Sequence, residues 1–499
     1  MKVLLIALQS NTDTIGLKYI LSCLRSNGIH AYILFLPTLH PGDMMAIRKF
    51  VREFSPGIIG ISLMSESFDK ARMVSSEIRK ECAHIVITWG GIHPSIAPRA
   101  CLEYADYVFI GESENSFLEF IRTLEERRTP HSIQNLAFLQ GDKIVINPLR
   151  PLINNLDSLP FPEHHPENSF VLHRNKIVKM DRRLFEKYSR FSGRFYSIMS
   201  IRGCPFSCSY CCNSFLAKLY GEQRIRTRSV DNIIEELRCA ISMYPDIIYV
   251  IIHDDDFFAH DIDWIKHFAD SYNDTICRRF ICCGTPRTIT AEKIRTLKSC
   301  GLSWVFIGLQ SGSSRTKREI YKRSVTNEAL LTVAQLAHEC GIAPLYDVIL
   351  DNPFEKEEDL RETVRLILAL PKPFQFQLYS LTFYEGTEIY RMAIERGLHI
   401  ENPCEKNYFH YRRTFFNKII RLCPLLPRPV IAFLVHHRNA MLTKVLLNAV
   451  YPLAIVFLEP LVWCRLILIS FDYSVGHAAT MTRAFIKTGV KKIILRQSA

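Results

Sequence analysis

The chain has 499 residues, 48% of them hydrophobic and 22% charged, which is enough for two to four domains that each bury a core. Most of its sixteen cysteines are scattered, and the apolar run in MKVLLIALQS is too short for a secretory signal, so we expect reduced thiols in the cytoplasm instead of a disulfide framework. The net charge of +12 lies wholly in residues 406–499, where fourteen Lys and Arg face only Glu459 and Asp472.

Residues 1–135 alternate short apolar runs with amphipathic stretches. The runs cover residues 3–8, 31–36, 58–62, 85–89 and 107–110. This alternation predicts a Rossmann-like (flavodoxin-like) α/β domain, an open parallel sheet with helices on both faces. Because such sheets bind ligands beyond the C-terminal ends of their strands, we expect a site in the loops there. These loops are Gln9–Gly16, Ser62–Ser67, and the stretches that start at Gly90 and Gly111.

Residues 136–195 are irregular and contain the proline-rich stretch LDSLPFPEHHPENS, which indicates an interdomain linker. A second alternating series follows over residues 196–400. Its expected strands lie near residues 196–201, 247–252, 279–283, 304–309, 346–350 and 376–381, and its expected helices near 229–242, 290–300, 327–340 and 356–370. This series predicts a partial (β/α)6 TIM barrel with its chemistry at the C-terminal mouth.

Residues 401–499 form a basic, apolar region that we expect to be mainly helical. The apolar run over residues 445–471 contains two charges and two prolines, whereas a clean membrane span needs about twenty uncharged residues. A re-entrant segment or one that lies on a membrane surface is therefore favoured over a span. The alternative is an apolar cap over the barrel mouth. Nucleic acid binding is not favoured, because the positive residues are interleaved with aliphatic runs.

The stretch RGCPFSCSYCC places Cys204, Cys208 and Cys211 at C-x3-C-x2-C spacing after the first expected barrel strand. A structural zinc site needs four ligands, and no second cysteine or histidine pair lies at zinc spacing nearby. Three clustered thiolates instead suit a [4Fe–4S] cluster that leaves one iron open to a ligand from outside the protein. We interpret Cys212 as a bystander, because neighbouring positions seldom both point at one cluster.

CPFSCSYC resembles the cysteine loop of radical SAM enzymes, and later stretches such as HDDDFF (253–258) and IGLQSGS (307–313) resemble landmarks of their barrel. The resemblance implies that the cluster binds S-adenosylmethionine (SAM) and cleaves it reductively to a 5′-deoxyadenosyl radical. It implies SAM contacts from Asp254, Asp255, Arg287, Gly308, Gln310 and Ser311. Gln310 stands where the family more often has Glu, which keeps a hydrogen-bonding group but removes a charge.

The first domain resembles the cobalamin-binding domain that precedes many radical SAM barrels, through GLKYILSCL, PGIIGISLMS, WGGIHPS and ADYVFIGESENSFLEFI in that order. The implied cobalamin contacts are Ser62, Met64, Ser65, Gly90, Gly91, His93, Gly111 and Glu112. Its first loop, SNTDTIG, has no histidine, so cobalamin would bind without a histidine ligand on cobalt. The alternative is a sheet that has lost its cofactor.

Together the resemblances imply a methyltransferase that uses a [4Fe–4S] cluster, SAM and cobalamin to methylate an unactivated carbon of a hydrophobic or lipid-like biosynthetic intermediate. An electron donor such as flavodoxin or ferredoxin would be a partner. The enzyme would be cytoplasmic and would associate peripherally with the inner face of the cytoplasmic membrane. A radical cyclisation or oxidation without methyl transfer is the alternative reaction. A tRNA-modifying enzyme and a binding module with a vestigial radical site are the alternatives from other classes.

Overall fold

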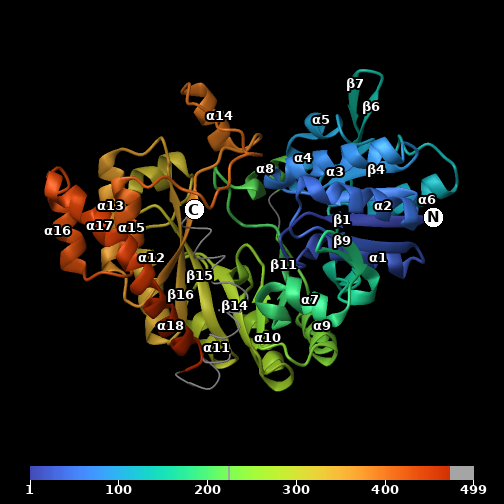
Figure 1. Cartoon of the computed structure of the whole chain (residues 1–499). Coiled ribbons are helices and arrows are strands. Elements are labelled where there is room, and N and C mark those ends of the chain that lie inside the picture. The colour runs from blue at the N-terminus through green and yellow to red at the C-terminus, as the bar shows by residue number, and fades with distance from the viewer. Residues whose placement is uncertain (223–224, 473–499) are drawn as a thin grey trace.

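The computed structural model describes residues 1–222 and 225–472, which form two α/β units side by side and a helical C-terminal region (Figure 1). The strands of the first unit's parallel core are β1 (Lys2–Ala7), β2 (His30–Phe35), β3 (Ile58–Ser62), β4 (Val86–Gly90) and β5 (Tyr107–Phe109). Its helices are α1 (Ile15–Ser26), α2 (Met44–Phe54), α3 (Phe68–Glu81), α4 (Ile92–Ile96), α5 (Pro98–Cys101) and α6 (Glu114–Glu125).

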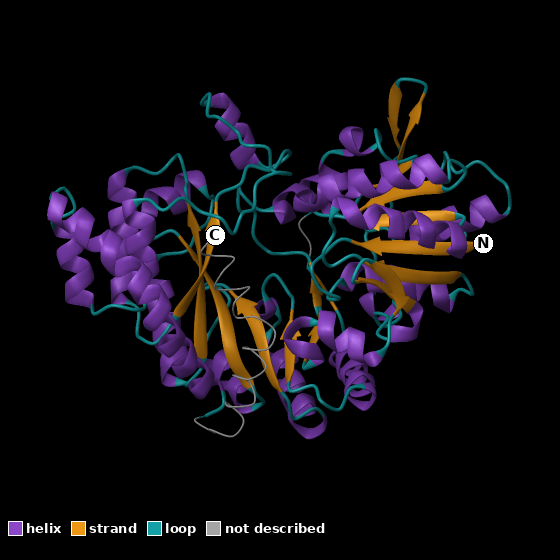
Figure 2. Cartoon of the chain, in the orientation of Figure 1, coloured by secondary structure: helices purple, strands orange, loops and turns teal. Residues whose placement is uncertain are grey.

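The parallel core of the first sheet has the order β5-β4-β3-β1-β2, the flavodoxin-like order predicted from the sequence. Its apolar runs are continuous because both faces of each strand are covered by helices. On β1, Leu4 and Ile6 pack into one hydrophobic cluster and Val3 and Leu5 into the opposite one. The C-terminal ends of these strands point toward the second unit (Figure 2).

Two hairpins extend this sheet, where the sequence led us to expect an interdomain linker over residues 136–195. They consist of β6 (Leu136–Gln140) with β7 (Lys143–Ile146), and β8 (Ser169–His173) with β9 (Lys176–Lys179). The second hairpin turns at Arg174 and Asn175, both with positive φ, and β8 pairs with the edge strand β2. The short helix α7 (Arg182–Tyr188) follows. The linker region is thus partly sheet, and the first domain extends beyond residue 135.

The second unit is a six-stranded parallel sheet, open on one side and curved with its helices outside (Figure 2). Its strands are β10 (Phe195–Ile198), β13 (Tyr249–Ile252), β14 (Arg279–Gly284), β15 (Leu302–Gln310), β16 (Ala343–Leu350) and β17 (Gln375–Ser380). Its helices are α9 (Val230–Met243), α10 (Ile262–Thr275), α11 (Ala291–Ser299), α12 (Asn327–Glu339), α13 (Glu357–Ala369) and α14 (Glu388–Glu395). The predicted partial barrel is confirmed, and α10 and α14 are the two of these helices that the sequence analysis did not assign.

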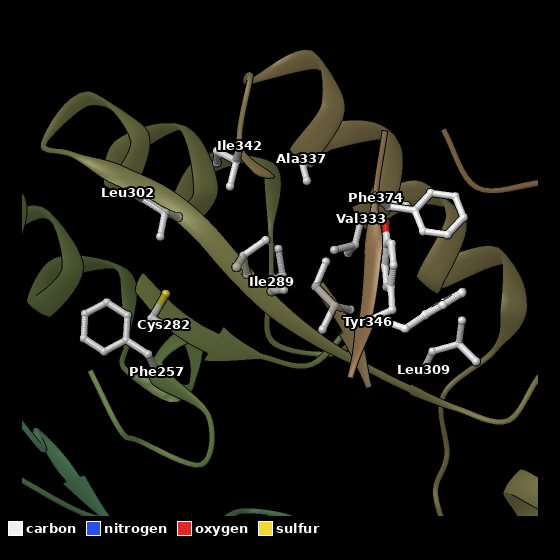
Figure 3. Packing of buried hydrophobic residues seen from close by; sticks show 14 of the residues in the cluster. Phe257, Cys282, Ile289, Leu302, Leu309, Val333, Ala337, Ile342, Tyr346 and Phe374 are labelled. Atoms are coloured by element: carbon white, nitrogen blue, oxygen red, sulfur yellow. The ribbon is translucent and has the colours of Figure 1, made fainter. Parts of the chain in front are cut away.

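The main core lies between this sheet and its outer helices. Figure 3 shows Cys282, Tyr346 and Phe374 among its side chains, all of them fully buried. Cys282 is therefore a packed thiol. Its neighbour Cys283 points to the other side of β14, into the barrel interior, because successive side chains of a strand alternate between faces.

The C-terminal region contains α15 (Phe415–Leu422), α16 (Arg428–His436), α17 (Met441–Phe457) and α18 (Glu459–Ser470). Leu466 and Ile467 of α18 pack against Trp304 and Leu345, near the N-terminal ends of β15 and β16. The Tyr249 hydroxyl donates a hydrogen bond to the Ser470 Oγ over 3.2 Å. An apolar cap therefore does exist, but it closes the barrel at the end opposite to the mouth.

Candidate active site

The cysteine loop crosses the barrel mouth and is held by segments that lie far away in the sequence. It follows the two-residue strand β11 (Ile201–Arg202), which pairs with β12 (Arg226–Thr227), and it ends where α8 (Cys212–Tyr220) begins. The buried Ser209 hydroxyl donates to the Ile320 carbonyl over 2.6 Å, and the Ser209 carbonyl accepts from the Ile389 amide over 3.0 Å. The loop thus has a defined position over the strand ends.

The thiols of Cys204, Cys208 and Cys211 lie in the same part of the barrel mouth. Each thiol lies within electrostatic range of the other two, and burial raises the pKa of Cys204 to about 12 in the absence of metal. Among the described residues no three His, Cys, Asp or Glu side chains are close enough together to hold a single metal ion. A cubane does not require that, because each cysteine binds a different iron. Cys212 starts α8, and its thiol hydrogen-bonds with that of Cys211.

The acidic run after β13 divides between two tasks. Asp254 is buried and accepts hydrogen bonds from the Ser200 amide over 2.7 Å, the Ile201 amide over 2.9 Å and the Ser200 hydroxyl. It therefore fixes the backbone just before the cysteine loop. Asp255 is exposed to the mouth and lies within electrostatic range of Cys204 and Cys211. Of these two predicted SAM residues, only Asp255 has a carboxylate directed toward the cysteines.

Arg287 lies beside the cysteine loop. Its guanidinium stands 5.4 Å from the centre of the Phe206 ring and donates to the Ser324 hydroxyl over 2.7 Å. Both residues line a pocket that also includes Cys208 and Arg323. The structure therefore brings this predicted SAM residue to the mouth.

Gly308, Gln310 and Ser311 end β15 in three different settings. A Cβ at Gly308 would lie 2.6 Å from the Arg323 guanidinium, so only glycine lets that side chain enter the mouth. Gln310 has φ +63° and lies at a break in the pairing of β15 with β16. The Ser311 hydroxyl is buried and donates to Glu355 over 2.7 Å, so this predicted SAM residue has its side chain engaged within the protein.

Two residues of the mouth escaped the sequence analysis. Arg323 donates to the Gly308 carbonyl over 3.0 Å and to the Tyr210 hydroxyl over 3.3 Å, and it hydrogen-bonds with Cys208. Asp347 pairs with Gly308 in the register of the sheet and has a buried oxygen without a hydrogen-bond partner among the described residues. A lone carboxylate within the apolar strand APLYDVIL was a signal that could have found Asp347. No spacing rule pointed to Arg323.

The predicted cobalamin residues on β3 and β4 gather at one edge of the first sheet. Ser62 ends β3 and Gly90 ends β4, while Met64, Ser65 and Gly91 lie in the loops that follow these strands. Gly91 has φ +101°, and a Cβ there would lie 2.8 Å from the Leu63 carbonyl oxygen, so the close approach of these two loops requires glycine.

His93 supports this edge from below. It is buried, its Nδ1 hydrogen-bonds with the Ser65 hydroxyl over 2.9 Å, and its ring packs edge-on against Phe68. Burial lowers the pKa of His93 to about 4, so the ring is neutral at physiological pH. Its Nε2 has no hydrogen-bond partner among the described residues. His93 thus orients Ser65, and Met64 and Glu66 are exposed side chains of this loop.

Gly111 and Glu112, the remaining two predicted cobalamin residues, lie at the junction between the domains. Tyr220, the last residue of α8, covers Gly111, and its hydroxyl accepts a hydrogen bond from the Glu112 amide over 2.8 Å. The Glu112 carboxylate pairs with Arg226 over 2.5 Å and with Arg202 over 3.5 Å. The helix that leaves the cysteine loop therefore ends in the first domain (Figure 1).

Comparisons with protein families identify both units. Residues 198–367 match the model of the radical SAM superfamily, and residues 1–121 match the model of the B12 binding domain. The chain thus combines a radical SAM domain with a B12-binding domain. It is an enzyme of the group that combines this barrel with a B12-binding domain, and the predicted cofactors, a [4Fe–4S] cluster, SAM and cobalamin, are confirmed at that level.

Known relatives agree with this assignment. The uncharacterized methyltransferase PH0819 of Pyrococcus horikoshii is 27% identical over 362 residues, which cover 70% of this chain and 72% of that protein. The anaerobic magnesium-protoporphyrin IX monomethyl ester cyclase of Cereibacter sphaeroides is 21% identical over 63% of this chain, and the match spans half of that relative's length. The cobalamin-dependent SAM radical enzyme OxsB, solved with aqua-cobalamin and SAM bound, shares the fold with a TM-score of 0.68 at 14% identity, over 100% of this chain and 80% of that chain.

The described residues fit these cofactors chemically. The three thiols lie within electrostatic range of one another, which suits a cluster in which each cysteine binds a different iron. The Arg323 guanidinium beside Cys208 supplies a positive charge where an amino acid carboxylate would need one. In the B12-binding domain the glycine at position 91 lets the loops after β3 and β4 approach each other closely.

Proposed function

We propose that this enzyme transfers a methyl group to an unactivated carbon of a hydrophobic, lipid-like intermediate. The observation that carries the proposal is the position of Tyr384, which lies within electrostatic range of both Glu66 and Cys212. Glu66 belongs to the loop after β3 on the B12-binding side, and Cys212 adjoins the cysteine loop. This position of Tyr384 supports an arrangement in which the two proposed cofactor sites face one another, as a shared substrate would require.

The cofactors supply the bond changes: when bound, SAM at the cluster provides the radical that removes hydrogen from carbon, and cobalamin provides the methyl group. The protein's own residues bind and orient these cofactors. In this proposal Cys204, Cys208 and Cys211 hold the cluster, Asp255 accepts from the SAM amino group and Arg323 pairs with its carboxylate. Gln310 and Asp347 offer hydrogen-bonding groups deeper in the mouth.

The barrel interior favours a hydrophobic substrate. Below the mouth it is lined by apolar side chains, among them Ile251, Ile281 and Phe306, which pack into one cluster with α18. Such a wall excludes water from a reactive radical and gives an apolar substrate a matching surface. The methyltransferase name of the relative PH0819 supports methyl transfer, whereas the cyclase relative supports ring formation as the second candidate.

The location proposed for the enzyme is the cytoplasm, with peripheral contact to the inner face of the membrane. Its support is the separation of charge, since the whole net charge of +12 resides in the apolar C-terminal region. The cluster also needs a low-potential electron donor such as flavodoxin or ferredoxin.

The test is anaerobic incubation of the reconstituted enzyme with SAM carrying a deuterated methyl group, a reductant and an apolar metabolite extract. We expect 5′-deoxyadenosine to form together with an apolar product that carries the labelled methyl group. An unlabelled product that has lost hydrogen would establish cyclisation or oxidation instead. Absence of 5′-deoxyadenosine in both the wild type and a Cys208→Ala control would identify a vestigial site.

Replacing Arg323 with alanine is expected to weaken SAM binding by about ten- to a hundredfold, because a hydrogen bond to a charged group contributes roughly 1.5–3 kcal/mol. Equilibrium dialysis of SAM against the anaerobically reconstituted enzyme measures this. Arg318→Ala is the matched control, since Arg318 is 79% exposed and pairs only with the adjacent Glu319 among the described residues. Equal SAM affinities for the two variants would refute the proposed role of Arg323.

The Asp347 carboxyl is expected to make the stability of the metal-free protein depend on pH. Burial raises the pKa of Asp347 to about 7, while the unfolded chain titrates near 3.9. Between pH 4 and pH 7 the folded protein holds one more proton on Asp347 than the unfolded chain does. The contribution of the protonated Asp347 carboxyl to the stability of the fold is therefore complete below pH 4 and is lost as the pH rises through 7. In the wild type the free energy of unfolding should decrease as the pH rises from 4 to 7. In Asp347→Asn this decrease should be smaller, by up to about 1.4 kcal/mol per pH unit. Urea titrations at pH 5, 6, 7 and 8 check this, and unchanged slopes would contradict it.

A further inference from the structure

One face of the last two helices carries a continuous row of exposed apolar side chains. We call this row the apolar stripe; its exposed fractions range from 44% to 78%. The members are Leu442, Val445, Leu446, Leu453, Val456, Phe457 and Leu461. Apart from the neighbouring pairs Val445/Leu446 and Val456/Phe457, their spacing of three, four or seven residues places them on one side of α17 and α18 along about 30 Å of helix.

The opposite face of the same helices is packed on the protein. Leu447 and Ala454 belong to the main core, and Leu466 and Ile467 close the barrel. Glu459 is buried, where it pairs with Arg421 of α15 over 3.1 Å. By length and composition Met441–Ser470 could cross a membrane, and 33% of its most apolar window is buried. If this segment crossed a membrane, Glu459 would lose its partner Arg421 and the barrel end that α18 covers would be exposed. The two helices are therefore placed to lie along a membrane instead.

The charges around the apolar stripe are positive. Lys444 and Arg465 are exposed at its two ends, and Arg428 starts the neighbouring helix α16. Glu459 is the single acidic residue within Met441–Ser470, and it faces the protein interior. A row of large apolar side chains with basic residues near its ends and no exposed acid within Met441–Ser470 matches the interface of an anionic bilayer.

We propose that the apolar stripe lies flat in the interface of an anionic membrane, with α17 and α18 parallel to the bilayer plane. The inference deepens the peripheral location included in the proposed function. It also separates anchoring from substrate entry, because α18 covers the barrel end opposite to the cysteine loop, as Figure 1 shows. In this arrangement the membrane contacts the end of the barrel that α18 covers. The barrel mouth remains open to the B12-binding domain.

The experiment uses the full-length chain with sedimenting vesicles of phosphatidylcholine, either pure or with phosphatidylglycerol. The wild type should sediment with the anionic vesicles at low salt, and less with pure phosphatidylcholine. The triple variant Leu453→Glu, Phe457→Glu and Leu461→Glu should lose binding by at least about tenfold, since three apolar contacts are replaced by repelled charges. The control Ile394→Glu alters a 56% exposed isoleucine on α14 and should bind as the wild type does.

Three outcomes would overturn the inference. The wild type could remain in the supernatant, or the triple variant could sediment as the control does. A wild-type dimer that the triple variant converts to a monomer, without vesicle binding by either, would assign the stripe to a second copy of the chain. Circular dichroism checks that the variant is folded. Formation of 5′-deoxyadenosine by the reconstituted variant distinguishes loss of anchoring from failure of the proposed reaction, because the substitutions lie outside the mouth.

Discussion

Replacing Cys208 with alanine is expected to remove the iron–sulfur cluster and lower 5′-deoxyadenosine formation by at least roughly a hundredfold. Loss of a protein ligand affects a metal site more than loss of its supporting hydrogen bonds, which alone costs about 10- to 100-fold. The remaining two thiols would leave two irons of a cubane without protein ligands. Iron and sulfide counts after anaerobic reconstitution, together with the visible spectrum, measure the cluster.

Cys212→Ala is the matched control for this prediction. Its thiol lies directly beside that of Cys211, and both substitutions remove one sulfur from the same segment. We expect the Cys212 variant to retain the cluster and the capacity to cleave SAM. If both variants lose iron equally, Cys212 is a ligand, and the assignment of three cysteines and one open iron fails.

Substituting Gly111 with alanine is expected to separate the two domains, because the new Cβ would overlap the Tyr220 hydroxyl. To make room, Tyr220 must leave the Glu112 amide, which also disturbs the pairing of Glu112 with Arg226. Overpacking of this kind costs about 1–3 kcal/mol. We expect this loss in the free energy of unfolding by urea, together with release of cobalamin during gel filtration of the loaded enzyme.

Gly28→Ala separates the clash from backbone strain. Gly28 has φ +79°, close to the +73° of Gly111, but a Cβ at Gly28 would meet no atom within 4 Å. Both variants therefore pay a similar conformational penalty, and only Gly111→Ala displaces Tyr220. Equal destabilisation of the two variants, with cobalamin retained by both, would show that the contact with Tyr220 does not hold the domains together.

Much of this fold can be predicted from the sequence because its buried strands have a strong local signal. Runs such as VLLIAL and WVFIGL are apolar on both faces, as parallel strands between helices must be. The cysteine loop is equally local, since three ligands occur within eight residues. Spacing alone therefore indicated the metal chemistry before any tertiary contact was known.

The parts that escaped prediction depend on contacts between distant residues. The strand Ser169–His173 is short, follows a proline-rich stretch and forms only because β2 offers a free edge. Similarly, Asp254 and Ser311 carry the residue types that a cofactor site needs, but neighbouring backbone and carboxylate groups take up their hydrogen-bonding capacity. Arg323 reaches the mouth only because Gly308, fifteen residues earlier, leaves room for it.

The length of helix α8 sets the distance between the cysteine loop and the B12-binding domain. It begins beside a cluster ligand and its ninth residue is Tyr220, so a rod of about 13 Å connects the cysteine loop to the B12-binding domain. One inserted residue would turn Tyr220 by roughly 100° about the helix axis and direct it away from Gly111. With two and a half turns, α8 is thus a rigid spacer between the cysteine loop and the B12-binding domain. Insertions or deletions in α8 should therefore be tolerated less than in a surface loop of the barrel.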